Sequence, residues 1–185
     1  MNNSNCQAGF ARIVADSRNA ETGDRITTFV LSRFPKVLLQ ELNTHRMMSR
    51  NAASSRAIPV EKLIERIKED PYNPRFTKSQ KGMSGIEDGD EKFQFDCEME
   101  WQSAMDEAIE RAWNLHSLGV HKQNANRLLE PFARVPVIIT ATEWDNFFKL
   151  RCDAAAHPDF REVAIAMRNA RNASTPICLG PGQWH

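Results

Sequence analysis

The segment 134–142 constrains the fold more than any other part of this chain, because it has the clearest strand pattern. Apolar and β-branched residues alternate between its two faces, with Val135, Val137 and Ile139 on one and Ile138 and Thr140 on the other. This alternation predicts a β-strand. Segments 10–15 and 25–31 predict two more strands, and the second is apolar enough on both faces to suggest a covered sheet.

Helical spacing accounts for most of the remaining residues. Apolar residues at i, i+3, i+4 and i+7 predict amphipathic helices over 59–70, 96–119, 121–132 and 158–171. Another helix begins at Pro35 and, projected onward, brings His45 and Arg46 into line with its apolar stripe; a capping-box pattern at 142–145 begins a sixth. We therefore predict an α/β (α+β) fold, a single domain over residues 1–185 with a small sheet packed against several helices.

Residues 71–94 interrupt this pattern. Prolines and glycines punctuate the segment, and an acidic run occupies 87–91. A loop of this length inside a compact domain is either functional or mobile. A surface insertion and an active-site lid both fit the sequence.

Composition limits the class of partner. The chain has 24 Lys and Arg against 24 Asp and Glu, and a protein held on nucleic acid usually shows a basic excess. Cys6, Cys97, Cys152 and Cys178 form no C-x-x-C pair, which is typical of reduced, intracellular thiols. No run is long and apolar enough for a membrane span, and the polar N-terminus lacks signal-peptide features. We expect a cytoplasmic protein without a nucleic-acid or membrane partner.

The stretch 43–57 is the first candidate binding site. It contains three arginines, one histidine and three serines in fifteen residues, with no acidic residue to neutralise them. One guanidinium group can bind two phosphate oxygens at once, and hydroxyl groups add further hydrogen-bond donors. This composition therefore predicts an anion site. A solvated basic loop after a helix would have the same composition.

Arg151 is the second candidate. It continues the apolar stripe formed by Trp144, Phe147 and Phe148. Burying an unpaired charge there would cost several kcal/mol, on the order of 3–5, so a carboxylate of the protein or an anionic ligand must meet it. Arg151 could also lower the pKa of the neighbouring Cys152, although apolar neighbours favour a buried, inert thiol.

Several common kinds of site are missing from the sequence. It has no P-loop, no G-x-G-x-x-G turn and no G-x-S-x-G elbow. No two histidines have the spacing of an H-x-x-x-H metal pair, so we predict no metal site.

The basic stretch resembles the signature of the flavin-dependent thymidylate synthases, R-H-R-x-x-S-x-N-E-x-S-x-R-Y. The matching residues are His45, Arg46, Ser49, Asn51, Ser54 and Arg56. Three positions depart from the signature: Thr44 replaces the first Arg, Ala52 the Glu and Ala57 the Tyr. Segments 126–131, 142–151 and 156–161 resemble, in the same order, the family's A-R-x-x-L-P, R-E-W-x-x-F-x-x-L-R and A-Q-x-E-I-R segments.

The resemblance implies the fold of this family and a homotetramer with active sites between subunits. It implies conversion of dUMP to dTMP with FAD as cofactor and with NADPH and methylenetetrahydrofolate as co-substrates. By position, the residues that would contact FAD are His45, Arg46 and Asn146, and those that would hold the nucleotide are Ser54, Ser55, Arg56 and Arg127. Arg151 would be the catalytic residue, binding the uracil and favouring ionisation at its N3.

The departures at Thr44, Ala52 and Ala57 keep two alternatives open. A related enzyme could use flavin and folate for another modification of a pyrimidine nucleotide, such as hydroxymethylation. A homologue that has lost turnover could bind nucleotide without catalysis.

Overall fold

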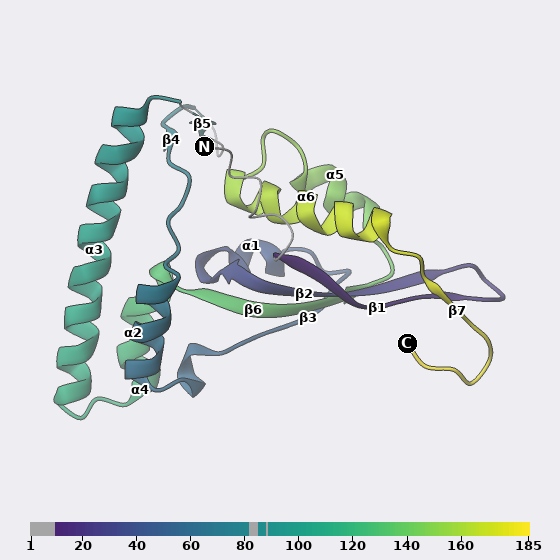
Figure 1. Ribbon diagram of the computed structural model, residues 1–185, viewed down its shortest axis with the longest axis horizontal. Coiled ribbons are helices and arrows are strands. Elements are labelled where there is room, and N and C mark those ends of the chain that lie inside the picture. The colour runs from purple at the N-terminus through teal and green to yellow at the C-terminus, as the bar shows by residue number, and fades with distance from the viewer. Residues whose placement is uncertain (1–9, 82–84, 88) are drawn as a thin grey trace. The chain divides into compact units, whose positions relative to one another are not determined.

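The computed structural model describes residues 10–81, 85–87 and 89–185 (Figure 1). The chain divides into two compact units, each made of separate segments. Unit 1 contains the chain up to Phe34 together with Gln40–Ala52 and Pro136–His185, and unit 2 contains Pro35–Leu39 and Ala53–Val135. The single-domain organisation stays a prediction.

Unit 1 is built on a mixed five-stranded sheet in the order β3-β6-β2-β1-β7. The strands are β1 (Ala11–Asn19), β2 (Arg25–Pro35), β3 (Ser49–Ala52), β6 (Arg134–Ala141) and β7 (Ile177–Leu179). Neighbours β1 and β2 are antiparallel, as are β3 and β6, whereas β7 runs parallel to β1. The strands predicted at 10–15, 25–31 and 134–142 are confirmed; β3 and β7 lack the apolar alternation that would have predicted them.

Helices α5 (Asp145–Arg151) and α6 (Pro158–Ala173) lie together on one face of this sheet (Figure 1). Alternation in the strands turns Phe29, Leu31 and Ile139 inward, and all three are fully buried. Trp144 and Phe160 complete this core, with the ring of Trp144 edge-on to Phe29 at 5.0 Å between centroids. The opposite face is covered less evenly: Ile138 on β6 is 43% exposed, whereas Thr28 on β2, the strand from which cover was expected, is 7% exposed.

A buried ion pair ties strands β1 and β2 to the end of α6. Asp16 on β1 accepts hydrogen bonds from Arg25 Nε at 2.8 Å and Nη2 at 2.6 Å, and from the hydroxyls of Thr27 and Ser174. Arg25 also donates to the main-chain oxygens of Arg171 and Ser174. Burial raises the pKa of Asp16, but these hydrogen bonds and the charge of Arg25 outweigh it and lower the pKa overall.

Unit 2 is mainly helical. Its elements are η1 (Lys36–Leu38), η2 (Ser55–Ala57), α2 (Val60–Glu69), β4 (Thr77–Lys78), β5 (Ile86–Glu87), α3 (Glu91–Ser117), α4 (Lys122–Ala125) and η3 (Asn126–Phe132). The core combines apolar side chains of α2, α3 and η3, such as Leu63, Met105 and Leu129. The predicted helix over 59–70 is confirmed by α2, in which Val60, Leu63, Ile64 and Ile67 are all buried.

Three predicted helix starts or ends are wrong. The helix expected from Pro35 is a short 3-10 turn followed by α1 (Leu39–Asn43), so it ends before His45. Helix α3 is capped by Asp90, whose side chain accepts from the main-chain N–H groups of residues 92 and 93, and not by Asp96. The 142–145 segment forms no side-chain cap for α5; the indole of Trp144 donates to the oxygen of Ala141 instead.

The early start of α3 also shortens the loop that we expected over 71–94. Residues 77–78 and 86–87 pair as the two-stranded sheet β4-β5, while positions 82–84 and 88 of the predicted loop lie outside the described residues. The predicted α/β class, with a small sheet packed against helices, is confirmed. Over the described part of the chain, no helix is long and apolar enough to cross a membrane.

Candidate functional site

The first half of the basic stretch forms a tight turn at the end of α1. Arg50 on β3 donates hydrogen bonds to the main-chain oxygens of Asn43, His45 and Met48. The hydroxyl of Thr44 donates to the oxygen of Glu41 at 2.7 Å. These bonds satisfy main-chain oxygens at and just beyond the end of α1 and so hold the turn in place.

This turn brings His45 against Arg151, the last residue of α5. Arg151 Nε donates to His45 Nε2 at 2.8 Å, so this nitrogen is the acceptor and the proton lies on Nδ1. Arg151 Nη1 donates to Glu41 Oε2 at 3.3 Å, and Nη2 donates to Thr44 Oγ1 at 3.4 Å. The short bond fixes the guanidinium against the imidazole, whereas the two long bonds hold it weakly.

Aromatic rings form the wall behind this pair. The Arg151 guanidinium lies over the ring of Phe160 at 4.7 Å from its centroid. The imidazole of His45 is edge-on to Phe147, with the two centroids 4.9 Å apart. A cation over an aromatic face is stabilised by the ring quadrupole, which explains how the structure accommodates an arginine on an apolar helix face.

His45 is neutral at physiological pH. Burial, followed by the positive charges of Arg151 and Arg50, lowers the pKa of His45 to about 4. A neutral imidazole can accept from Arg151, which a protonated one could not. The local positive charge is therefore carried by arginine alone.

A pocket of about 350 Å³ lies over this pair in unit 1. Its lining includes His45, Arg46, Asn146 and Arg151, all predicted site residues, together with exposed Met47 and Leu150. Residues from two distant parts of the sequence thus meet in one pocket, as a shared site requires. Their roles in binding and catalysis stay predictions.

The remaining predicted residues lie in unit 2, on η2 and η3. The Ser54 side chain accepts from the main-chain N–H of Arg56 and so caps η2. Ser55 is buried, and Asn126 holds it in place by donating to the main-chain oxygens of Ser55 and Ile58 at 2.7 and 2.9 Å. Arg56 is exposed and reaches Gln123 at 3.3 Å.

Arg127 joins Ser55 through a shared carboxylate. Ser55 Oγ donates to Glu130 Oε1 at 2.5 Å, and Arg127 Nη1 donates to the same oxygen at 3.0 Å. The structure therefore brings Ser54, Ser55, Arg56 and Arg127 into one neighbourhood of unit 2. Their role in holding a nucleotide stays a prediction.

Sequence reasoning missed the acidic and aromatic partners of these arginines. Glu41 lies outside the segments that resemble the family, and Glu130 and Phe160 stand where those segments have Leu and Ile, so the motifs assign no role to any of the three. One signal was available: a charge on an apolar stripe predicts an acidic partner, which for Arg151 is Glu41. Choosing Glu41 from 24 acidic residues needs the fold.

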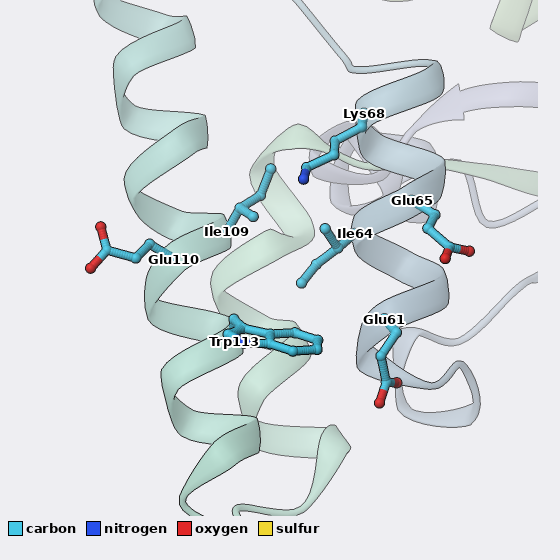
Figure 2. Close-up of a pocket in the computed structure, with 7 residues that line it drawn as sticks. All are labelled: Glu61, Ile64, Glu65, Lys68, Ile109, Glu110 and Trp113. Atoms are coloured by element: carbon cyan, nitrogen blue, oxygen red, sulfur yellow. The ribbon is translucent and has the colours of Figure 1, made fainter.

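A second pocket, of about 570 Å³, lies between α2 and α3 and contains none of the predicted site residues. Ile64 and Trp113 point toward each other across it, while Glu65 and Glu110 point away (Figure 2). Ile64, Ile109 and Trp113 give its apolar surface, and the ammonium group of Lys68 also turns toward α3 in Figure 2. One such group is fewer than the several convergent polar groups that position a polar substrate.

Cys152, the residue after Arg151, is a half-buried free cysteine. Burial raises the pKa of its thiol, and the charge of Arg168 offsets part of this increase. The inert thiol that the apolar neighbours favoured is the better interpretation.

Comparison with known proteins identifies the class of this fold. It is similar to the crystal structure of the UMP/dUMP methylase PolB from Streptomyces cacaoi bound with 5-Br UMP, with a TM-score of 0.66 and 17% identity over 87% of each chain. The profile of the thymidylate synthase complementing protein family matches residues 25–177. The chain belongs to this family, and the predicted resemblance is confirmed. A search of the curated proteins finds no significant match.

Proposed function

We propose that this protein is a flavin-dependent thymidylate synthase that methylates dUMP to dTMP, with FAD as cofactor and NADPH and methylenetetrahydrofolate as co-substrates. Family membership supports a nucleotide-modifying enzyme, and the similar structure belongs to a methylase of UMP and dUMP by its title. The observation that carries the proposal is Arg151, a cation held by neutral His45 on an aromatic wall.

The geometry of Arg151 suits the binding of a uracil ring. Its 2.8 Å bond to His45 orients the guanidinium, and its bonds to Glu41 and Thr44, at 3.3 and 3.4 Å, are long enough for a ligand oxygen to replace. A fixed cation stabilises negative charge that develops on the ring, which favours ionisation at N3. In unit 2, Ser55, Arg56 and Arg127 would supply the hydroxyl and guanidinium donors for the phosphate.

The residues of the unit 1 pocket also fit part of a flavin. A flavin combines a planar apolar ring system with a pyrophosphate, so its site needs apolar surface beside fixed positive charge. Met47 and Leu150, which are 70% and 52% exposed, supply the first, and Arg46 supplies the second. His45, Arg46 and Asn146 would hold this group, which supplies the reducing equivalents when bound.

Purification with added FAD tests the proposal directly. We expect a yellow protein whose flavin absorption changes on addition of dUMP, and which forms dTMP when NADPH and methylenetetrahydrofolate are present. A colourless protein that FAD does not reconstitute would contradict this function. Light scattering in solution would test the homotetramer that the resemblance implies.

A second candidate function is hydroxymethylation of a pyrimidine nucleotide. It is favoured by Ala52 and Ala57, whose methyl groups cannot make the hydrogen bonds of the signature's Glu and Tyr. Mass analysis of the products formed from dUMP, UMP and dCMP distinguishes the two reactions. Binding of nucleotide without any product would support a non-catalytic homologue.

A further inference from the structure

A carboxylate occupies the centre of the basic cluster in unit 2. Glu130 Oε1 accepts from Ser55 Oγ at 2.5 Å and from Arg127 Nη1 at 3.0 Å, and it lies 4.0 Å from the ammonium group of Lys36. Arg127 Nη1 reaches the second oxygen, Oε2, at 3.2 Å. Two cations and one hydroxyl thus converge on a single internal anion.

This arrangement matches the donor set that a phosphate group would use. A phosphate accepts charge-assisted hydrogen bonds from guanidinium, ammonium and hydroxyl groups. Glu130 accepts hydrogen bonds from a guanidinium and a hydroxyl group, and the ammonium group of Lys36 lies 4.0 Å away as an ion-pair partner. A second anion in the same place would be repelled by the carboxylate, so the two cannot share these donors. Either Glu130 or the ligand holds them at one time.

The donors differ in how freely they can move. Ser55 is 4% exposed and is fixed through the bonds from Asn126, and the Lys36 side chain is 14% exposed. The Arg127 side chain is 58% exposed, and Glu130 is 22% exposed. Ser55 and Lys36 therefore form a fixed base, while the more exposed side chains of Arg127 and Glu130 can each change position, so that Glu130 can turn toward solvent and leave Arg127 behind.

We propose that Glu130 is a built-in competitor for the phosphate of the substrate. The carboxylate occupies the phosphate position in the free protein, and a nucleoside monophosphate binds by displacing it from Ser55, Lys36 and Arg127. The identity of the ligand as a nucleotide rests on the proposed function, whereas competition for an anion does not. Glu130 thereby weakens binding and excludes ligands that carry a weaker anion.

Glu130→Gln tests this competition, because it removes the charge but keeps the length of the side chain. Calorimetry with inorganic phosphate and with dUMP would compare this variant with the wild type. We expect each ligand to bind Glu130→Gln about tenfold more tightly, an increase that shrinks at high salt. Glu65→Gln, on α2, is the matched control for loss of one negative charge and should leave both affinities unchanged.

Glu130→Asp provides an independent variant, because the shorter Asp side chain brings its carboxylate less close to Ser55. This variant should bind inorganic phosphate more tightly than the wild type but less tightly than Glu130→Gln. Unchanged or weaker phosphate binding in the folded Gln or Asp variant would overturn the proposal. Tighter phosphate binding without any dUMP binding would keep this inference and contradict the nucleotide substrate. Equal dUMP binding by wild type and Glu130→Gln would contradict this inference and leave the nucleotide substrate standing.

Discussion

Arg25 and Arg151 both contact a carboxylate within unit 1, but the protein surrounds them differently. Arg25 gives two short bonds to buried Asp16, whose side chain is 5% exposed, and it also binds two main-chain oxygens. Arg151 makes its only short bond to neutral His45 and a long one to Glu41, whose side chain is 39% exposed. A saturated ion pair stabilises the fold, whereas an incompletely neutralised guanidinium can still bind an anion.

The largest effect should come from breaking the saturated pair. Asp16→Asn leaves Arg25 partly buried without its counter-charge, so the free energy of unfolding should fall by about 3 kcal/mol. Urea denaturation measures this loss. Asp24→Asn, on the exposed β1–β2 turn, is the control and should change stability by less than about 0.5 kcal/mol. Equal losses in the two variants would show that the buried pair has no special weight.

Removing Arg151 should affect turnover more than stability. Arg151→Ala removes a cation that acts on charge developing in the substrate, so kcat should fall about 100- to 1,000-fold while flavin remains bound. Steady-state kinetics and the flavin spectrum provide the two measurements. Full activity in this variant would place the uracil elsewhere.

The neutral state of His45 gives the pocket a pH dependence above pH 4, whereas that of Asp16, whose pKa is also lowered, falls at more acidic pH. The pKa of His45 is about 4 in the folded protein, below the usual value of 6.5, so the unfolded chain binds a proton first as the pH falls. Stability is therefore complete above pH 6.5 and declines toward pH 4, by about 1–2 kcal/mol after allowance for solvent screening. The unfolding free energy, measured at several pH values across this range, should depend less on pH in His45→Gln than in the wild type. An equal dependence in the two proteins would exclude His45 as its source.

Glu41 should contribute least. Glu41→Gln keeps a hydrogen-bond acceptor near Arg151 but removes the partly exposed charge, so the unfolding free energy should fall by less than about 1 kcal/mol. The same variant should change kcat/KM by a few-fold at most. If Glu41→Gln lost as much unfolding free energy as Asp16→Asn, Arg151 would stabilise the fold in the same way as Arg25.

The sequence predicts the strands and helices of this fold better than it predicts which side chains contact one another. Period-two and helical spacing identify β1, β2, β6 and α2 because burial of one face imposes those patterns. β3 could not be predicted, since its four residues, Ser49–Ala52, pair at a sheet edge without an apolar face. Similarly, Arg151 could be singled out by its anomalous position, but the choice of His45 and Phe160 as its neighbours depends on how α5 and α6 pack.

The interleaving of the two units has a consequence for how the protein can be made and dissected. Strand β2 ends at Pro35 and its neighbour β6 begins only at Arg134, so closing the sheet requires a long loop to form first. Such long-range pairing slows folding. A ribosome must synthesise nearly all of unit 2 before unit 1 can close, and no single cut in the chain releases either unit whole.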